Sequence, residues 1–364
     1  MKTIVVKVGS NILTTEYGIN DKRIGSIAKA VSTIHEMGYS VAVVSSGAVV
    51  AGKRKLHLDN KNLDIKLKQA SAAVGQSSLI RFYERRFAQY GKMVAQILIT
   101  QDAFDDRRRY INAKNTIQTL FSFGIIPVIN ENDTVAVDEI KFGDNDRLAS
   151  LVAGMLGAER LFILSDVEGL FDKDPKRSKQ ACLIEKVDEI SDELMKVVGN
   201  STSSGGTGGM YSKMLAAKHA SENGITVNIL GGKRPANMVS ILEGKNHGTL
   251  INAKIKRLSS RKGWIAHGIK AKGSLSLDAG AIDALMEKGK SLLPSGIVSV
   301  TGTFDIGDAV NCEDNKGNKV AKGLTNYSSS EINRIKGKKT SEIEKELGYR
   351  YSDEVIHRDN LVKL

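Results

Sequence analysis

The chain has 364 residues, more than one domain usually contains, so its length predicts two domains. Hydrophobic residues make up 41% and charged residues 26%, which is typical of globular proteins, and no apolar run approaches the roughly 18 residues that a membrane-spanning helix needs. The net charge of +12 indicates polyanionic partners, which include both nucleic acids and nucleotides.

The chain starts with MKTIVVKVGS, whose apolar run is too short for a signal peptide and is interrupted by a second lysine. The two cysteines, Cys182 and Cys312, lie far apart and have no metal-ligand spacing. These features predict a cytoplasmic enzyme or binding protein that has no contact with a membrane.

The first ~250 residues alternate short apolar runs with helical patterns, which predicts an α/β fold around a mainly parallel sheet. Buried strands are predicted at 3–8, 41–46, 94–100, 125–130, 161–166 and 226–230, and amphipathic helices at 21–37, 64–90, 112–122 and 145–157. Four of the strands end in small or polar residues, namely Gly9-Ser10, Ser45-Ser46-Gly47, Asn130-Glu131-Asn132-Asp133 and Ser165-Asp166. Open α/β sheets bind ligands at the carboxyl ends of their strands, so we expect the chemistry at that edge.

Lys7 stands within the first predicted strand, in IVVKVGSN, where a buried parallel strand should be apolar. If the strand lies at an edge of the sheet, Lys7 is an ordinary solvated lysine. If the strand is central, the ammonium group points at the ligand-binding edge and needs an anion there. The sequence leaves both positions open.

Asparagine and aspartate crowd two loops in INENDTVAVDEIKFGDNDRLASLVAG, and the second loop opens a helix. One such residue at a helix start is most often an N-cap. The second loop, however, supplies Asp144, Asn145 and Asp146, and the first supplies Asn130 and Asp133. This surplus beside strand ends suits binding of a charged amino group, or the orientation of lysines and a hydrated Mg²⁺.

Residues 201–220, STSSGGTGGMYSKMLAAKHA, contain neither G-x-x-x-x-G-K-[ST] nor G-x-G-x-x-G. Their glycines would let the backbone approach an anion, and the helix predicted from Met210 has an N-terminus that favours negative charge. Lys213 falls in the first turn of that helix, an unfavourable place for a cation unless an anion such as phosphate neutralises it. Composition alone also fits a flexible linker, so the stretch is either a phosphate loop or a linker.

After about residue 270, strand-like pieces separated by Gly, Asp and Asn predict a small, mostly β domain with one helix near 279–288. The segment 251–272 carries seven Lys or Arg residues and no Asp or Glu. It fits a solvated connection between domains, or contact with nucleic acid or an acidic partner. Trp264 is the only tryptophan and lies in this connection, so no aromatic platform for RNA bases is evident.

No Ser-His-Asp or Cys-His set is visible, so two lysines, a Gly-rich loop and acidic groups without an obvious base indicate phosphoryl transfer. Together these elements resemble the amino acid kinase family, most closely its members that phosphorylate glutamate, over nearly the whole chain. The resemblance rests on VVKVGSNIL, VSSGAVVAG, KQASAAVGQ, PVINENDTVA, KFGDNDRLAS, DPKRS and GTGGMYSKMLAA, and it continues through SLLPSGIVSVTGTF and LGYRYSDEVIHRD.

The resemblance implies a three-layer αβα sandwich around a mainly parallel sheet at residues 1–253 and a basic linker at 254–270. Residues 271–364 resemble a PUA domain, a small, mostly β module known elsewhere for binding modified RNA. The implied reaction is the ATP-dependent phosphorylation of the γ-carboxylate of L-glutamate to L-glutamyl 5-phosphate, which opens proline biosynthesis.

The resemblance also assigns residue roles. Lys7 and Lys213 would embrace the transferring phosphoryl group, and Asp146 would hold both lysines. Glutamate binding is assigned to Ser46, Asn130, Asp133, Asp144 and Asn145. ATP binding is assigned to Lys7, Ser165, Asp166, Thr207, Gly208, Gly209, Met210, Tyr211, Ser212 and Lys213. Ser165 and Ser212 stand where the family often has threonine, and both keep the hydroxyl. No metal ligand is assigned, since Mg²⁺ is expected to come with ATP.

Further partners are implied by the resemblance alone. They are proline as a feedback inhibitor near residues 133–146, further copies of the chain in a homo-oligomer, and glutamyl phosphate reductase, the next enzyme of the pathway. Two alternatives remain: a kinase for another small carboxylic acid, against which the NEND and GDND loops argue, and an RNA-binding protein that uses its PUA-like domain.

Overall fold

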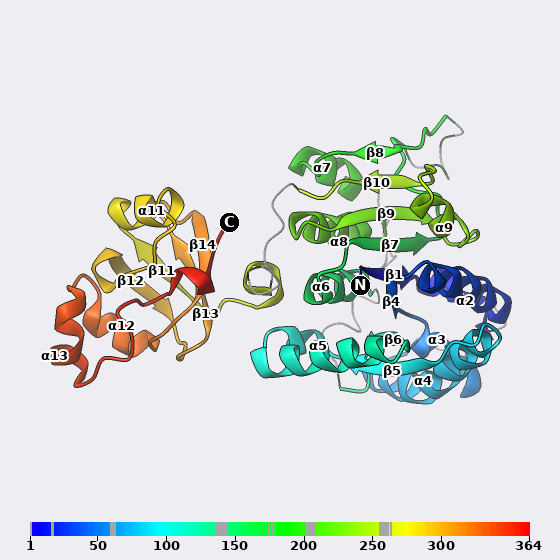
Figure 1. Ribbon diagram of the computed structural model, residues 1–364, viewed down its shortest axis with the longest axis horizontal. Helices are drawn as coiled ribbons and strands as arrows, with labels where there is room; N and C mark the ends of the chain where they lie inside the picture. The colour runs from blue at the N-terminus through cyan, green and yellow to red at the C-terminus, as the bar shows by residue number, and fades with distance from the viewer. Residues whose placement is uncertain are drawn as a thin grey trace. The chain divides into compact units, whose positions relative to one another are not determined.

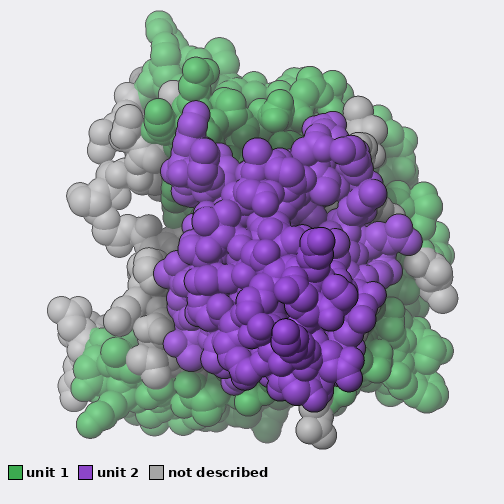
Figure 2. All heavy atoms as spheres, turned by 90° about the vertical axis from the view of Figure 1, so that its left-hand side faces the viewer, with its two compact units in different colours: residues 1–257 green, residues 258–364 purple. Residues whose placement is uncertain are grey.

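The computed structural model of the protein describes residues 2–15, 18–58, 63–135, 145–173, 175, 178, 180–200, 209–254, 262 and 264–364. The chain forms two compact units, Met1–Arg257 and Leu258–Leu364, which are coloured separately in Figure 2. In the described part of the chain, no helix is both long and apolar enough to cross a membrane.

The first unit is built on an eight-stranded sheet with the order β5-β6-β4-β1-β7-β9-β10-β8. Adjacent strands are parallel except for the antiparallel pair of β9 and β10. The strands are β1 (Thr3–Val8), β4 (Ser40–Val44), β5 (Val94–Ile99), β6 (Ile126–Glu131), β7 (Arg160–Ser165), β8 (Lys186–Val187), β9 (Thr226–Gly231) and β10 (Thr249–Ile251). The expected mainly parallel sheet is confirmed, and β1 lies at its centre between β4 and β7.

Helices cover both faces of this sheet, so the expected three-layer αβα sandwich is confirmed (Figure 1). One layer contains α2 (Asp21–Glu36), α3 (Ala48–Lys55), α4 (Ile65–Ala88) and α9 (Asn237–Leu242), and the other contains α5 (Arg107–Ser122), α6 (Asp146–Leu156), α7 (Asp192–Asn200) and α8 (Met210–Glu222). The short elements α1 (Ser10–Leu13), β2 (Thr14–Thr15), β3 (Gly18–Ile19) and η1 (Gln101–Phe104) fill connections. The sequence patterns did not predict α3, α7, α9, β8 and β10, because segments this short carry little periodicity.

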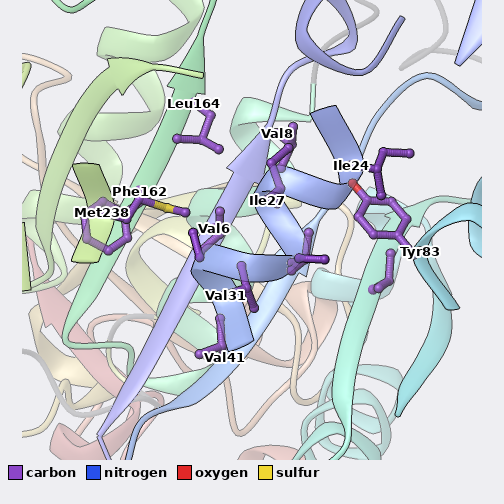
Figure 3. Close-up of a cluster of buried hydrophobic side chains, with 14 of the residues drawn as sticks. Val6, Val8, Ile24, Ile27, Val31, Val41, Tyr83, Phe162, Leu164 and Met238 are labelled. Carbon is purple, nitrogen blue, oxygen red and sulfur yellow. The ribbon is translucent and has the colours of Figure 1, made fainter. Parts of the chain in front are cut away.

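Alternation along β1 explains how a lysine fits into a central strand. Ile4, Val6 and Val8 belong to the core cluster that β1 shares with α2 and α4 (Figure 3). Because side chains alternate across a strand, Val5 and Lys7 face the opposite layer, where α6 contacts β1. Lys7 is 0% exposed, so of the two positions that the sequence left open, the central one is correct.

Two glycines allow α3 and α4 to cross with their backbones almost in contact. A Cβ on Gly75 of α4 would lie 1.8 Å from the carbonyl oxygen of Ala48, and one on Gly52 of α3 would lie 1.6 Å from that of Ser71. Both obstacles are backbone atoms, which cannot rotate away. The crossing therefore fixes the start of α3, which directly follows the polar end of β4.

We expect Gly75→Ala to lower the free energy of unfolding by about 3 kcal/mol, because the added methyl group must push two helix backbones apart. Gly154→Ala in α6 is a matched control, since its Cβ would have its nearest neighbour, the Cγ of Asn223, 4.0 Å away. Removing a mid-helix glycine without a clash should instead stabilise by up to about 1 kcal/mol. Chemical denaturation of both variants measures the difference, and equal stabilities would contradict the tight crossing.

The second unit contains a five-stranded sheet with the order β12-β11-β13-β14-β15. Its strands are β11 (Gly273–Leu277), β12 (Ile297–Gly302), β13 (Ala309–Glu313), β14 (Lys319–Leu324) and β15 (Leu361–Lys363), and its helices are α11 (Ala279–Met286), α12 (Ser329–Ile335) and α13 (Ile343–Leu347). Strands β11 to β14 and α11 match the sequence-based expectation, whereas β15 was not predicted. Helices α12 and α13 were not predicted, although a capping box of Ser328 and Glu331 marks the start of α12.

Candidate functional site

The polar ends of four parallel strands meet at one edge of the large sheet. Because β6, β4, β1 and β7 are neighbours that run in the same direction, the residues that follow them lie side by side. The residues that this arrangement places at the edge are Lys7, Ser45-Ser46, Asn130 and Ser165-Asp166. The polar strand ends therefore lie together at the carboxyl edge of the sheet, where the sequence led us to expect the chemistry.

A buried carboxylate joins two lysines from different elements at this edge. The Oδ1 of Asp146 lies 2.6 Å from the Nζ of Lys7, and its Oδ2 lies 3.4 Å from the Nζ of Lys213. All three residues are buried: Lys7 is 0% exposed, Asp146 1% and Lys213 5%. Charged groups are buried at such a cost that they are normally paired, and Asp146 here pairs with both lysines at once.

The positions of Asp146 and Lys213 follow from two packed helices. Asp146 is in the first turn of α6, where a negative charge is favourable, and Lys213 is in the first turn of α8. The hydroxyl of Ser212 adds a third contact, 3.0 Å from the same Oδ2 of Asp146. The unfavourable place of Lys213 is thus compensated by a carboxylate from a neighbouring helix.

The N-terminus of α8 has the features of an anion site. Gly209 is the N-cap in extended geometry, without a side-chain cap bond, and the first turn contains no acidic residue. The first N–H groups of a helix have no partner within the helix, and the helix dipole favours an anion beside them. The helix predicted from Met210 is confirmed. The predicted loop residues Thr207 and Gly208 lie outside the described residues.

A second set of side chains surrounds the ends of β4 and β6. The amide of Asn145 donates to the carbonyl of Ser45 and, at 2.6 Å, to the Oδ1 of Asn130. Asn145 is the N-cap of α6 but makes no side-chain cap bond, so its amide serves the strand ends instead. Asp133 follows β6 and is half-buried, whereas Asp144 lies outside the described residues.

Two atoms of this set point to a ligand. The Oγ of Ser46 and the Nδ2 of Asn130 are both buried and have no hydrogen-bond partner in the described part of the chain. Leaving a buried polar atom unpaired costs about 1–3 kcal/mol, so such atoms usually await a partner. A hydroxyl and an amide donor suit a carboxylate-bearing ligand.

The third part of the edge is the end of β7. The Oγ of Ser165 lies 3.2 Å from the Oδ1 of Asp166, and the carbonyl of Ser165 accepts a bond from the N–H of Gly232 at 2.7 Å. Ser165 pairs in register with Gly231 at the end of β9. Within the described ranges, no three His, Cys, Asp or Glu side chains are grouped so that they could hold a metal ion.

One polar contact beside this edge was not predicted from the sequence. The hydroxyl of Tyr83, in α4, lies 3.0 Å from the Oγ of Ser45. Burial raises the pKa of Tyr83, and the bond to Ser45 opposes the shift only in part, so the hydroxyl keeps its proton. The four-residue spacing of Tyr83 from Leu79 and from Phe87 is typical of the buried face of a helix, and no pattern in the nearby sequence indicates the contact with Ser45.

Comparison with known proteins gives a consistent picture for both units. The model of the amino acid kinase family matches residues 2–231, and that of the PUA domain matches residues 273–347. The chain is 49% identical over 362 residues to a glutamate 5-kinase of Thermoanaerobacter sp. (strain X514), covering 99% of this chain and 97% of the relative. It is 46% identical over 365 residues to a glutamate 5-kinase of Geobacter sulfurreducens, covering 100% and 98%.

Solved structures show the same fold at low identity. Carbamate kinase from Giardia lamblia, bound to AMP-PNP, is 17% identical and superimposes with a TM-score of 0.52, covering 70% of this chain and 99% of its own. UMP kinase from Bacillus anthracis, also 17% identical, has a TM-score of 0.50 and coverages of 70% and 96%. At these identities the likeness concerns the fold alone.

Proposed function

Because the chain belongs to the amino acid kinase family and, within it, to the glutamate 5-kinases, we propose that Lys7, Asp146 and Lys213 form its phosphoryl-transfer centre. The reaction is the ATP-dependent phosphorylation of L-glutamate, the first step of proline biosynthesis. The observation that carries the assignment is the pair of buried lysines on one carboxylate at the ligand-binding edge of the sheet.

The chemistry explains why the site contains two lysines and no obvious base. A glutamate side chain has a pKa of about 4.3, so at pH 7 the attacking γ-carboxylate is already ionised. The enzyme has to bring this anion to the γ-phosphate of ATP, which is also an anion. Lys7 and Lys213 would neutralise the oxygens of the transferring group, and Asp146 would hold both ammonium groups in position.

ATP would lie between the end of β7 and the N-terminus of α8. Ser165 and Asp166 would contact the nucleoside, and the backbone of the loop at 207–213 would hold the phosphates, as anions at helix N-termini are held. We propose that Mg²⁺ arrives with ATP, because this ion is commonly bound through substrate phosphates and a few waters.

Glutamate would occupy the ends of β4 and β6. The unpaired Ser46 Oγ and Asn130 Nδ2 support this placement, because both can donate to a carboxylate. Asn145 lies beside them, and Asp133 and Asp144 would bind the amino group. The γ-carboxylate would then face the two lysines.

An ADP-release assay with L-glutamate, L-aspartate and N-acetylglutamate tests this specificity. We expect turnover with glutamate and at least tenfold lower kcat/KM with the other two, because the shorter or blocked acid leaves buried polar groups unpaired. Turnover of aspartate alone would overturn the substrate assignment.

Ser46→Ala is expected to raise the KM for glutamate about tenfold, because a hydrogen bond to a charged group is lost, and to leave the KM for ATP unchanged. Ser150→Ala is the matched control: this serine is also buried, but its hydroxyl donates to the carbonyl of Arg147 within α6. Steady-state kinetics compares the two. An unchanged KM for glutamate in Ser46→Ala would remove the serine from the pocket.

Four further properties are proposed from the same family membership. Proline would inhibit the enzyme near residues 133–146, and copies of the chain would assemble into a homo-oligomer. The labile acyl phosphate would pass to glutamyl phosphate reductase, and the protein would be located in the cytoplasm, where ATP and glutamate are supplied. The PUA domain is of an RNA-binding type, and with the basic segment 251–272 it makes weak RNA binding a second candidate function. Titration of the full chain with total tRNA at increasing salt tests it, and salt-insensitive or absent binding would exclude it.

A further inference from the structure

The motif KQASAAVGQ, residues 68–76, has no part in the site described so far, although it lies in a helix that passes behind the ends of β4 and β6. We propose that Gln76 and Tyr83 of α4 are positioning residues of the glutamate pocket, which hold its two strand ends in place without touching the substrate. The proposal rests on the proposed function, since it concerns the same pocket.

Tyr83 controls the end of β4 through a short chain of hydroxyl groups. The Oγ of Ser45 donates to the carbonyl of Ser46 at 3.3 Å, and with its proton used in this way it can accept from the hydroxyl of Tyr83, 3.0 Å away. The carbonyl of Ser45 in turn accepts from the amide of Asn145. A displacement of Ser45 would therefore move both Ser46 and Asn145.

Gln76 controls the end of β6 in the same manner. Its Nε2 donates to the carbonyl of Glu131 at 3.2 Å, and the side chain is 7% exposed. The N–H of Glu131 donates to the Oδ1 of Asn130 at 3.0 Å, the same oxygen that Asn145 contacts. The orientation of the Asn130 amide, and hence the direction of its unpaired Nδ2, thus depends on where Glu131 is held.

Both residues act from one rigid surface. Gln76 and Tyr83 are seven residues apart, two helical turns, so they project from the same face of α4. Gly75, the residue before Gln76, is where α4 meets the backbone of α3. Since α3 begins immediately after Gly47, the helix that holds the strand ends also holds the segment that follows them.

A tyrosine is not needed here for packing alone. A phenylalanine would fill nearly the same space in the core and would avoid burying a hydroxyl, which is costly unless it is bonded. The hydroxyl of Tyr83 is bonded to a residue of the strand end, so its removal should affect the pocket more than the core.

The test compares Tyr83→Phe with Tyr327→Phe. Tyr327 is equally buried and its hydroxyl is also bonded, to the backbone of Ser352, but it lies in the second unit. We expect Tyr83→Phe to raise the KM for glutamate about fivefold to tenfold, with the KM for ATP within twofold of wild type. Tyr327→Phe should leave both values unchanged, even if both variants melt at a lower temperature.

Two further variants complete the experiment. Gln76→Met removes the donor and keeps the length of the side chain, and we expect the same selective rise in the KM for glutamate. In a Ser45→Ala background, Tyr83→Phe should have no further effect on this KM, because the shared contact is already gone. If Tyr83→Phe does not fold, the positioning role is tested by Gln76→Met, through the same comparison of the KM for glutamate with the KM for ATP.

An unchanged KM for glutamate in folded Tyr83→Phe and Gln76→Met, or an equal rise for both substrates, would overturn the positioning role. A wild-type enzyme that turns over ATP but does not phosphorylate glutamate would contradict the proposed function instead, so the two failures are distinguishable.

Discussion

Lys213→Ala is expected to lower kcat by about 10²- to 10³-fold while ATP still binds, because one of the two cations that face the transferring phosphoryl group is lost. Of the two proposed ammonium groups, only that of Lys7 then remains beside the γ-carboxylate and the transferring group. The nucleotide should keep the contacts that we propose with the carboxyl end of β7 and the N-terminus of α8. Single-turnover kinetics, together with a separate ATP-binding titration, separates the loss of transfer from a loss of binding.

Lys218→Ala is the matched control for this experiment. Lys218 lies in the same helix, α8, but its Nζ is 3.0 Å from the Oδ1 of the exposed Asp192. Its removal should leave kcat unchanged. A near-normal kcat in Lys213→Ala, or an equal loss in both variants, would exclude Lys213 from the mechanism.

Asp146→Asn is expected to lower the free energy of unfolding by about 3–5 kcal/mol, because it removes the carboxylate that two buried lysines share. Turnover should also be lost, since neither ammonium group is held in place. Saturating Mg·ATP should then raise the melting temperature of the variant by more than it raises that of wild type, because the phosphates supply the missing negative charge.

Differential scanning calorimetry with and without Mg·ATP measures this effect. Asp192→Asn is the control, since it removes the carboxylate of an exposed pair and should leave both the stability and the response to nucleotide unchanged. If Asp146→Asn is as stable as wild type, the carboxylate does not hold the lysines. If Mg·ATP stabilises both proteins equally, the phosphates do not replace it.

Much of the fold could be read from the sequence because the core strands are continuous apolar runs. All six predicted strands of the first unit are present within two residues of their expected bounds. Lys7 was recognisable as unusual because it breaks such a run. The environment of Lys7 could not be predicted, because the central position of β1 depends on its pairing with β4 (residues 40–44) and β7 (residues 160–165).

The contacts that the sequence could not supply are those between distant elements. Nothing near Tyr83 or Gln76 indicates that their polar atoms meet Ser45 and Glu131, 38 and 55 residues away. The same holds for the contact of Gly75 with Ala48, which only a tight helix crossing explains. Periodicity identifies the buried face of a helix, but its partner is set by the packing of the whole domain.

The most direct test of the account is a crystal structure with L-glutamate, Mg²⁺ and a non-hydrolysable ATP analogue. We predict that the Nζ atoms of Lys7 and Lys213 both lie about 3 Å from oxygens of the γ-phosphate, with the γ-carboxylate of glutamate facing it from the ends of β4 and β6. A γ-phosphate remote from either lysine, or a glutamate bound away from Ser46 and Asn145, would contradict the account.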